Sequence, residues 1–198
     1  MVGSGLAHSQ GQHLPGCQRI CPIETVWSEF PKGPSTHLTL IPAPMESIGT
    51  IHLSFQAGLQ FQVDFGLGEG PFITTDAAPP LGSGRGPDSE RLLMAAVANC
   101  LSASLVFALR KFRNADAPVH TRVQGWLERN DQGRLRMHSI AVDIHLGVPA
   151  SSLRLVERAI DQFEDFCVVT QSVRAAFPVV ARVFDSEGVL LTGTGTSV

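Results

Sequence analysis

An uncharged stretch from Leu92 to Leu109 is the feature that most restricts how this chain can fold. It runs for 18 residues without Asp, Glu, Lys or Arg and is rich in Ala, the strongest helix former. A helix-start signal precedes it, with Pro87 at the expected first helical position and the acidic residues Asp88 and Glu90 in the first turn. The pattern predicts one long helix over about residues 87–112.

The same stretch is near the lower length limit for a membrane-spanning helix. Three polar side chains interrupt it, Asn99, Ser102 and Ser104. A helix that is apolar on most of its faces also suits the centre of a globular domain. We therefore expect a buried central helix and no membrane partner.

Alternating apolar and polar residues predict three β-hairpins around this helix. The first covers residues 51–65 and is expected to bury one face. The second runs from Val119 to Leu146, and its apolar phase slips near Ser139–Ile140, which suggests a β-bulge. The third covers residues 179–191.

A second helix is predicted between the last two hairpins, with Ser151 or Ser152 as its cap. Its apolar residues repeat on one face, at Leu153, Val156, Ile160, Phe163 and Cys167. Hairpins grouped around two helices indicate an α+β fold with an antiparallel sheet and two central helices.

Residues 1–46 show no sustained period and contain many Gly, Pro, Ser and His residues. We expect a flexible extension there, in which Leu38–Ile41 could add a strand, followed by one domain over residues 47–198. His13, Cys17 and Cys21 supply only three ligands at a spacing that is not a standard zinc pattern, so we expect no metal site.

Charge and composition exclude several function classes. A formal net charge of -3 and a pI near 6.1 argue against a nucleic-acid partner. The first residues contain no secretory signal, so we expect a cytoplasmic protein. Cytoplasmic thiols stay reduced unless they are catalytic, and four cysteines in 198 residues do not make a disulfide scaffold. The cysteines therefore point to chemistry.

Cys100 lies in the middle of the long helix, and Cys167 closes the apolar stripe of the second helix. Either thiol alone is more often core packing, because free cysteine is among the most buried residue types. Two amphipathic helices in one small domain must pack on each other. Both thiols are therefore expected to face the same seam.

Two segments, GPDSERLLMAAVANC at residues 86–100 and FCVVTQSVRAAFPV at residues 166–179, carry a family resemblance. They are similar to the two cysteine segments of the OsmC/Ohr family, the osmotically inducible and organic hydroperoxide resistance proteins. The order of hairpins and helices agrees over about residues 49–193. The resemblance implies an OsmC-like α+β fold that forms an intertwined homodimer with its sites at the subunit interface.

The resemblance also implies a thiol-dependent hydroperoxide reductase without a metal or organic cofactor. Cys100 would be the peroxidatic thiolate, which becomes a sulfenic acid, and Cys167 the resolving thiol that forms a disulfide with it. An external dithiol, or a lipoylated protein in the organic-hydroperoxide branch, would reduce that disulfide. The apolar seam favours an organic hydroperoxide as substrate.

Glu90 matches a functional glutamate of the family. It lies ten residues before Cys100, which is about 15 Å along a straight helix. We therefore hypothesise that Glu90 serves Cys100 of the partner subunit. The alternative is that it only favours the helix dipole from the first turn.

One departure from the family concerns the cation that activates the thiol. The family's peroxidases pair the glutamate with an arginine from the N-terminal strands, yet no Lys or Arg occurs between Lys32 and Arg85. A cationic neighbour is the usual way to lower a thiol pKa from about 8.5. Arg85 is the best substitute by position and Arg174 the next, although either could be a solvated surface residue. Val168 also stands where the family commonly has Pro.

Two further functions stay open, and this departure favours the first of them. One is a non-enzymatic OsmC-like dimer that senses redox state or binds an apolar ligand, with weak or no peroxidase activity. The other is a structural dimer whose cysteines only fill the core.

Overall fold

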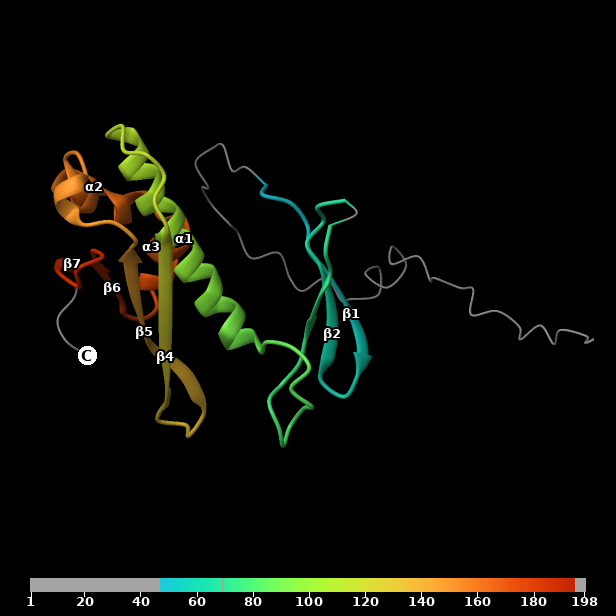
Figure 1. Ribbon diagram of the computed structural model, residues 1–198. Coiled ribbons are helices and arrows are strands. Elements are labelled where there is room, and N and C mark those ends of the chain that lie inside the picture. Colours follow the sequence, from blue (N-terminus) through green and yellow to red (C-terminus); the bar gives the residue numbers. More distant parts are fainter. Residues whose placement is uncertain (1–46, 69, 195–198) are drawn as a thin grey trace, which may run out of the picture. The chain divides into compact units, whose positions relative to one another are not determined.

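The computed structural model of the protein describes residues 47–68 and 70–194. In this part, seven strands form one sheet of three strands and one of four, and three α-helices accompany them (Figure 1). The elements in chain order are β1 (His52–Ala57), β2 (Gln60–Asp64), β3 (Ile73–Thr75), α1 (Ser89–Lys111), β4 (Val119–Arg129), β5 (Leu135–Leu146), α2 (Val156–Phe163), α3 (Val168–Arg174), β6 (Val179–Phe184) and β7 (Leu190–Thr194). The strand expected at Leu38–Ile41, and the residues His13, Cys17 and Cys21, lie outside the described residues.

The long helix α1 is confirmed, but its expected start is wrong by two residues. Pro87 lies outside the helix, and its carbonyl accepts a hydrogen bond from the N–H of Asp76 at 3.2 Å. Asp88 is the N-cap, because its carboxylate accepts the N–H of Arg91 at 2.9 Å. An aspartate that satisfies a free N–H of the first turn is a favoured helix start.

The core accounts for the apolar character of α1. By length and composition alone, α1 is long and apolar enough to cross a membrane. In the structure it lies along the sheet of β4–β7 and contacts α2 and α3 (Figure 1). Its buried residues are Val97, Ala98, Leu101, Ser104, Leu105, Ala108 and Leu109. All of these except Ser104 pack in one cluster with alternate residues of β5, Ile140, Val142, Ile144 and Leu146.

The second and third hairpins are confirmed as β4–β5 and β6–β7. The expected bulge is confirmed one residue earlier: Trp126 pairs with Ser139 and Leu127 with Met137, so His138 is the extra residue. One pairing departs from the expected antiparallel sheet, because β5 and β6 are parallel. The chain crosses through α2 and α3 between these strands, as a parallel connection requires.

The predicted single second helix is wrong. The segment Ala150–Ser152 forms a 3₁₀ turn and provides no cap, and α2 begins after Leu155, which has a left-handed backbone (φ 49°). A second 3₁₀ turn, Glu164–Phe166, follows α2, and the extended backbone of Cys167 separates that turn from α3. This break places Cys167 at a junction between helices rather than on the face of one.

The first hairpin is confirmed as β1–β2, and the short strand β3 joins it. Register puts Leu53 opposite Val63, and Phe55 opposite Phe61, on one face. The expected burial of this face is not found in the single chain: Val63 is buried, but Leu53 is 61% and Phe55 64% exposed. Residues 47–68 and 70–194 thus leave Leu53 and Phe55 of this face uncovered.

Candidate functional site

The structure brings Cys100 and Cys167 together. Cys100 lies in the middle of α1 and is half-buried, whereas Cys167 is fully buried. Both are free thiols. Burial raises the pKa of the Cys167 thiol, and the nearby Cys100 side chain raises it further. Cys100 also packs against the buried cluster that contains Cys167, so the two thiols lie close enough to interact.

Thr170 is a further residue of this site that the sequence did not reveal. The Cys167 thiol donates a hydrogen bond from Sγ to Thr170 Oγ1 at 3.0 Å, and both residues are fully buried. The hydroxyl and the backbone N–H of Thr170 act to lower the pKa of Cys167. The spacing of three residues between Cys167 and Thr170 would have predicted this contact only if the start of α3 at Val168 had been known.

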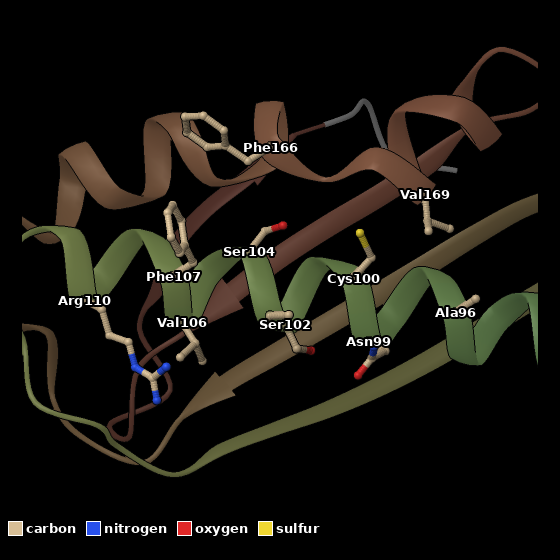
Figure 2. Close-up of a pocket in the computed structure, with 11 residues that line it drawn as sticks. Ala96, Asn99, Cys100, Ser102, Ser104, Val106, Phe107, Arg110, Phe166 and Val169 are labelled. Carbon is tan, nitrogen blue, oxygen red and sulfur yellow. The ribbon is translucent and has the colours of Figure 1, made fainter. Parts of the chain in front are cut away.

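A hollow of about 900 Å³ opens beside Cys100. Figure 2 shows the Cys100 sulfur pointing away from α1 towards the segment that carries Val169. Further along α1, the rings of Phe107 and Phe166 meet edge to face, with 6.4 Å between their centroids. The mostly apolar hollow therefore gives an apolar molecule access to a half-buried thiol.

Arg110 is the one cation among the described residues that line this hollow. Its guanidinium binds both carboxylate oxygens of Asp116, at 2.6 and 2.8 Å, and lowers the pKa of that carboxyl group. Arg110 is ten residues after Cys100 in α1, which corresponds to about 15 Å along the helix. It is too far along the helix to stabilise the Cys100 thiolate directly.

Arg174 binds groups other than the two thiols. Its guanidinium forms an ion pair with the carboxylate of Glu164 and donates to the carbonyl oxygen of Val179 at 2.9 and 3.0 Å. Glu164 is only 7% exposed. The pair fixes the 3₁₀ turn before Cys167 to the start of β6, and Arg174 does not line the hollow beside Cys100.

Arg85 lies in the loop before α1 and lines a different hollow from Cys100. Its side chain lines a polar hollow of about 320 Å³ whose other residues are Gln56, Gln60, Gln62 and Thr74. Over residues 47–68 and 70–194, no carboxylate forms an ion pair with its guanidinium. Within one chain, Arg85 is therefore separate from the hollow beside Cys100.

Asp76 organises the loop that carries Arg85. Its Oδ2 accepts the N–H groups of Ser83 at 3.0 Å and of Arg85 at 3.1 Å. These bonds, with that of Arg85 the largest cause, lower the pKa of the buried carboxyl group. Its Oδ1 has no hydrogen-bond partner among the described residues. A Cβ at Gly82 would lie 2.4 Å from that oxygen.

Glu90 lies exposed in the first turn of α1, at a third place. It lines a hollow of about 480 Å³ together with the loop of residues 77–81, Met94 and Met137. Cys100 does not line this hollow. Of the four sequence-predicted site residues, one chain brings together the two cysteines but leaves Glu90 and Arg85 apart from them.

Over residues 47–68 and 70–194, no three His, Cys, Asp or Glu side chains are grouped so that they could hold a metal ion. The hollow beside Cys100 is lined mainly by apolar side chains, together with Asn99, Ser102, Ser104 and Arg110, and the buried thiol of Cys167 interacts with Cys100. Such a site suits thiol chemistry on an apolar molecule.

The profile of the family described as OsmC-like protein matches residues 82–182, just over half of the chain. No curated protein matches the chain.

Solved structures share the fold. An OsmC-like protein of unknown function from Vibrio cholerae is 16% identical, with a TM-score of 0.59, over 70% of this chain and 100% of that one. An organic hydroperoxide resistance protein from Legionella pneumophila is 15% identical, with a TM-score of 0.53, over 70% and 98% of the two chains. The organic hydroperoxide resistance protein OhrB of Bacillus subtilis is 14% identical, with a TM-score of 0.52, over 69% and 99%. The predicted OsmC-like α+β fold is thereby confirmed.

Proposed function

The chain belongs to the OsmC-like protein family, and from this we propose that it is a hydroperoxide reductase that uses Cys100 and Cys167 as its redox pair. The observation that carries the proposal is the contact between a half-buried Cys100 and a fully buried Cys167, beside a hollow of about 900 Å³. Two proteins of the same fold are named organic hydroperoxide resistance proteins, which supports this choice.

In the proposed cycle, Cys100 is oxidised first, and the Cys100–Cys167 disulfide forms second. The Cys100 thiolate attacks the terminal oxygen of the hydroperoxide; an S–O bond forms, the O–O bond breaks, and the alkoxide takes a proton and leaves as an alcohol. Cys100 is then a sulfenic acid. The Cys167 sulfur attacks the Cys100 sulfur; an S–S bond forms, and the S–O bond breaks to release hydroxide, which leaves as water. An external dithiol, such as a lipoylated protein, restores both thiols by exchange.

The proposed substrate is an organic hydroperoxide. The hollow beside Cys100 exposes apolar side chains such as Val106, Phe107 and Val169, which favour an alkyl or aryl group over a small polar peroxide. No cofactor takes part in these steps, because both electrons come from the two thiols. A cytoplasmic location would keep the pair reduced between turnovers.

We propose that the working form is a homodimer. The apolar face of β1–β2 lies open in the single chain, with Leu53 and Phe55 both more than half exposed. Contiguous exposed apolar side chains mark an interaction surface. A second copy of the chain would cover this face and complete the site.

In this dimer, Glu90 of the partner subunit is proposed to serve Cys100. Along α1 the two residues are about 15 Å apart in one chain and line separate hollows. Arg85 is proposed as the accompanying cation, also from the partner subunit, since Arg174 is held by Glu164. A guanidinium beside the thiolate would stabilise it and the departing alkoxide.

A second candidate function is a dimer that binds an apolar ligand or senses redox state slowly. The observation that favours it is the absence, among the described residues lining the hollow, of any cation other than Arg110. Without a nearby cation, only a small fraction of a thiol with a pKa of about 8.5 is ionised at neutral pH.

The deciding experiment is intact-mass and peptide mass spectrometry of the reduced protein after one equivalent of cumene hydroperoxide, with Cys100→Ser and Cys167→Ser in parallel. We expect a rapid Cys100–Cys167 disulfide in the unmodified sequence, no disulfide in Cys100→Ser, and overoxidised Cys100 in Cys167→Ser. Peptide mapping separates these sulfurs from Cys17 and Cys21. Thiols that remain unmodified after prolonged exposure would overturn the proposal in favour of the ligand-binding dimer.

A further inference from the structure

Cys167 is placed where a thiol is a poor nucleophile. The residue is fully buried, and burial raises its pKa. The neighbouring Cys100 side chain raises it further. Since the thiolate is the form that attacks another sulfur, the second step of the proposed cycle needs a group that offsets this environment.

Thr170 is the polar side chain that contacts this sulfur. Its Oγ1 lies 3.0 Å from Cys167 Sγ, and its side chain has no exposed surface. A β-branched side chain has restricted rotation about χ1, and the full burial of Thr170 restricts it further. The contact therefore restricts where the sulfur can lie.

The hydroxyl of Ser172, two residues further on, forms the hydrogen bond that is usual for a hydroxyl in a helix. Ser172 Oγ donates to the carbonyl oxygen of Val168 at 2.9 Å, which is the common bond of a helical Ser or Thr to the residue four positions earlier. The hydrogen bond found for the Thr170 side chain is instead with the thiol. The two hydroxyls of α3 thus have different partners, and Ser172 provides a natural control.

The hydroxyl can serve both protonation states of Cys167. In the thiol state, S–H donates to Thr170 Oγ1. When the thiol loses its proton, the O–H of Thr170 can rotate and donate to the sulfur, since a hydroxyl is both donor and acceptor. The proton from Cys167 ends on the hydroxide that leaves Cys100, and water is formed. Thr170 keeps its own proton throughout.

We propose that Thr170 is a positioning residue for the resolving step: its hydroxyl holds the sulfur of Cys167 against Cys100 and steadies it during the attack. This rests on the proposed function. It concerns only the second step, since Thr170 does not line the hollow where the peroxide would bind. Loss of this hydroxyl should therefore slow disulfide formation without changing the rate of Cys100 oxidation.

The test compares Thr170→Val, which removes the hydroxyl and keeps the shape, with Thr170→Ser, which keeps the hydroxyl. Thr170→Ala is a second hydroxyl-free variant in case the valine does not fold, and Ser172→Ala removes the other hydroxyl of α3. Rapid mixing with cumene hydroperoxide, acid quench and mass spectrometry give the rate of Cys100 oxidation and the rate of disulfide formation. Circular dichroism verifies folding.

We expect Thr170→Val to leave the oxidation of Cys100 unchanged and to slow disulfide formation about tenfold, the effect of one hydrogen bond to a charged group. Its disulfide rate should rise towards the wild-type value at higher pH, and more Cys100 should become overoxidised. Thr170→Ser and Ser172→Ala should behave like the wild type. A wild-type disulfide rate in a folded Thr170→Val or Thr170→Ala protein would overturn the inference.

The same variants are treated with diamide, which forms a disulfide from two neighbouring thiols without any peroxide. If the wild type does not react with peroxide, the proposed function fails, but the diamide rates still test Thr170. The inference requires slower diamide-driven Cys100–Cys167 formation in Thr170→Val than in Thr170→Ser. Equal rates would refute it independently of peroxidase activity.

Discussion

Glu90 and Cys100 share the helix α1 but line two different hollows. Ten residues separate them, which is about 15 Å along the helix axis. A carboxylate of one chain therefore does not reach the thiol of the same chain. If Glu90 takes part in thiol chemistry, it does so in a second subunit.

Mixed dimers test this arrangement. We expect Cys100→Ser and Glu90→Gln each to lose most activity as homodimers. A purified heterodimer of the two variants would regain one working site, because Cys100 of the Glu90→Gln subunit would meet the intact Glu90 of its partner. The measurement is the steady-state rate of hydroperoxide reduction by differently tagged heterodimers.

The opposite result is equally clear. A heterodimer as inactive as both parents would mean that Glu90 acts on the site of its own chain. A fully active Glu90→Gln homodimer would mean that Glu90 only stabilises the start of the helix.

Phe55 tests the open sheet face. Its side chain is 64% exposed in the single chain and stacks edge to face on Phe61. Burying such a side chain contributes about 2 kcal/mol, so Phe55→Lys should weaken self-association by at least tenfold. Light scattering across a dilution series, with Ser54→Lys on the opposite face as the control, measures this. Equal association of both variants would exclude this face from the interface.

Asp76 makes the stability of the loop before α1 depend on pH. Its pKa is lowered from 3.8, first by the N–H of Arg85, so its stabilisation is present above pH 3.8 and is lost as the pH falls through the lower folded value. We expect Asp76→Asn to unfold at a lower temperature at pH 7 and to lose less stability on acidification than the wild type. Thermal melts between neutral pH and about pH 2 measure it. The exposed Asp131→Asn should change nothing, and parallel wild-type and Asp76→Asn curves would contradict the prediction.

Gly86 is required for steric reasons. A Cβ there would lie 1.9 Å from the backbone oxygen of Thr74, which cannot move without shifting β3. At Gly70 an added Cβ would meet its nearest atom at 3.5 Å, an ordinary contact. We expect Gly86→Ala to lower the free energy of unfolding by about 2 kcal/mol or more, and Gly70→Ala by much less. Urea unfolding of both variants measures these free energies, and equal values for the two variants would contradict the prediction.

The Arg174–Glu164 ion pair should matter for stability. Arg174→Met leaves the buried carboxylate of Glu164 without its guanidinium, and such a loss costs about 3 kcal/mol. The double variant with Glu164→Gln should recover part of this loss, because no buried charge remains. A single variant as stable as the wild type in urea would show that the pair is dispensable.

Much of the fold was predictable because local patterns encode it. The uncharged run of residues 92–109 predicted α1, and alternation predicted all three hairpins; the slip near Ser139–Ile140 predicted a bulge within one residue of its place at His138. The split of the second helix was not predictable. Leu155 has a left-handed backbone and Cys167 an extended one, and neither residue type favours a break by itself. Contacts with α1 and the ion pair of Glu164 accompany these turns.

The sequence by itself determined the family, the order of elements and the two thiols that would face one seam. Periodicity and motif spacing carry that information, since both are properties of neighbouring residues. Only the tertiary structure decided that Thr170 forms a hydrogen bond with Cys167 and that Glu164 forms an ion pair with Arg174. It also decided that Glu90 and Cys100 line different hollows. These relations depend on where the chain bends and which surfaces pack, and packing joins side chains whose partners are not fixed by their separation in sequence.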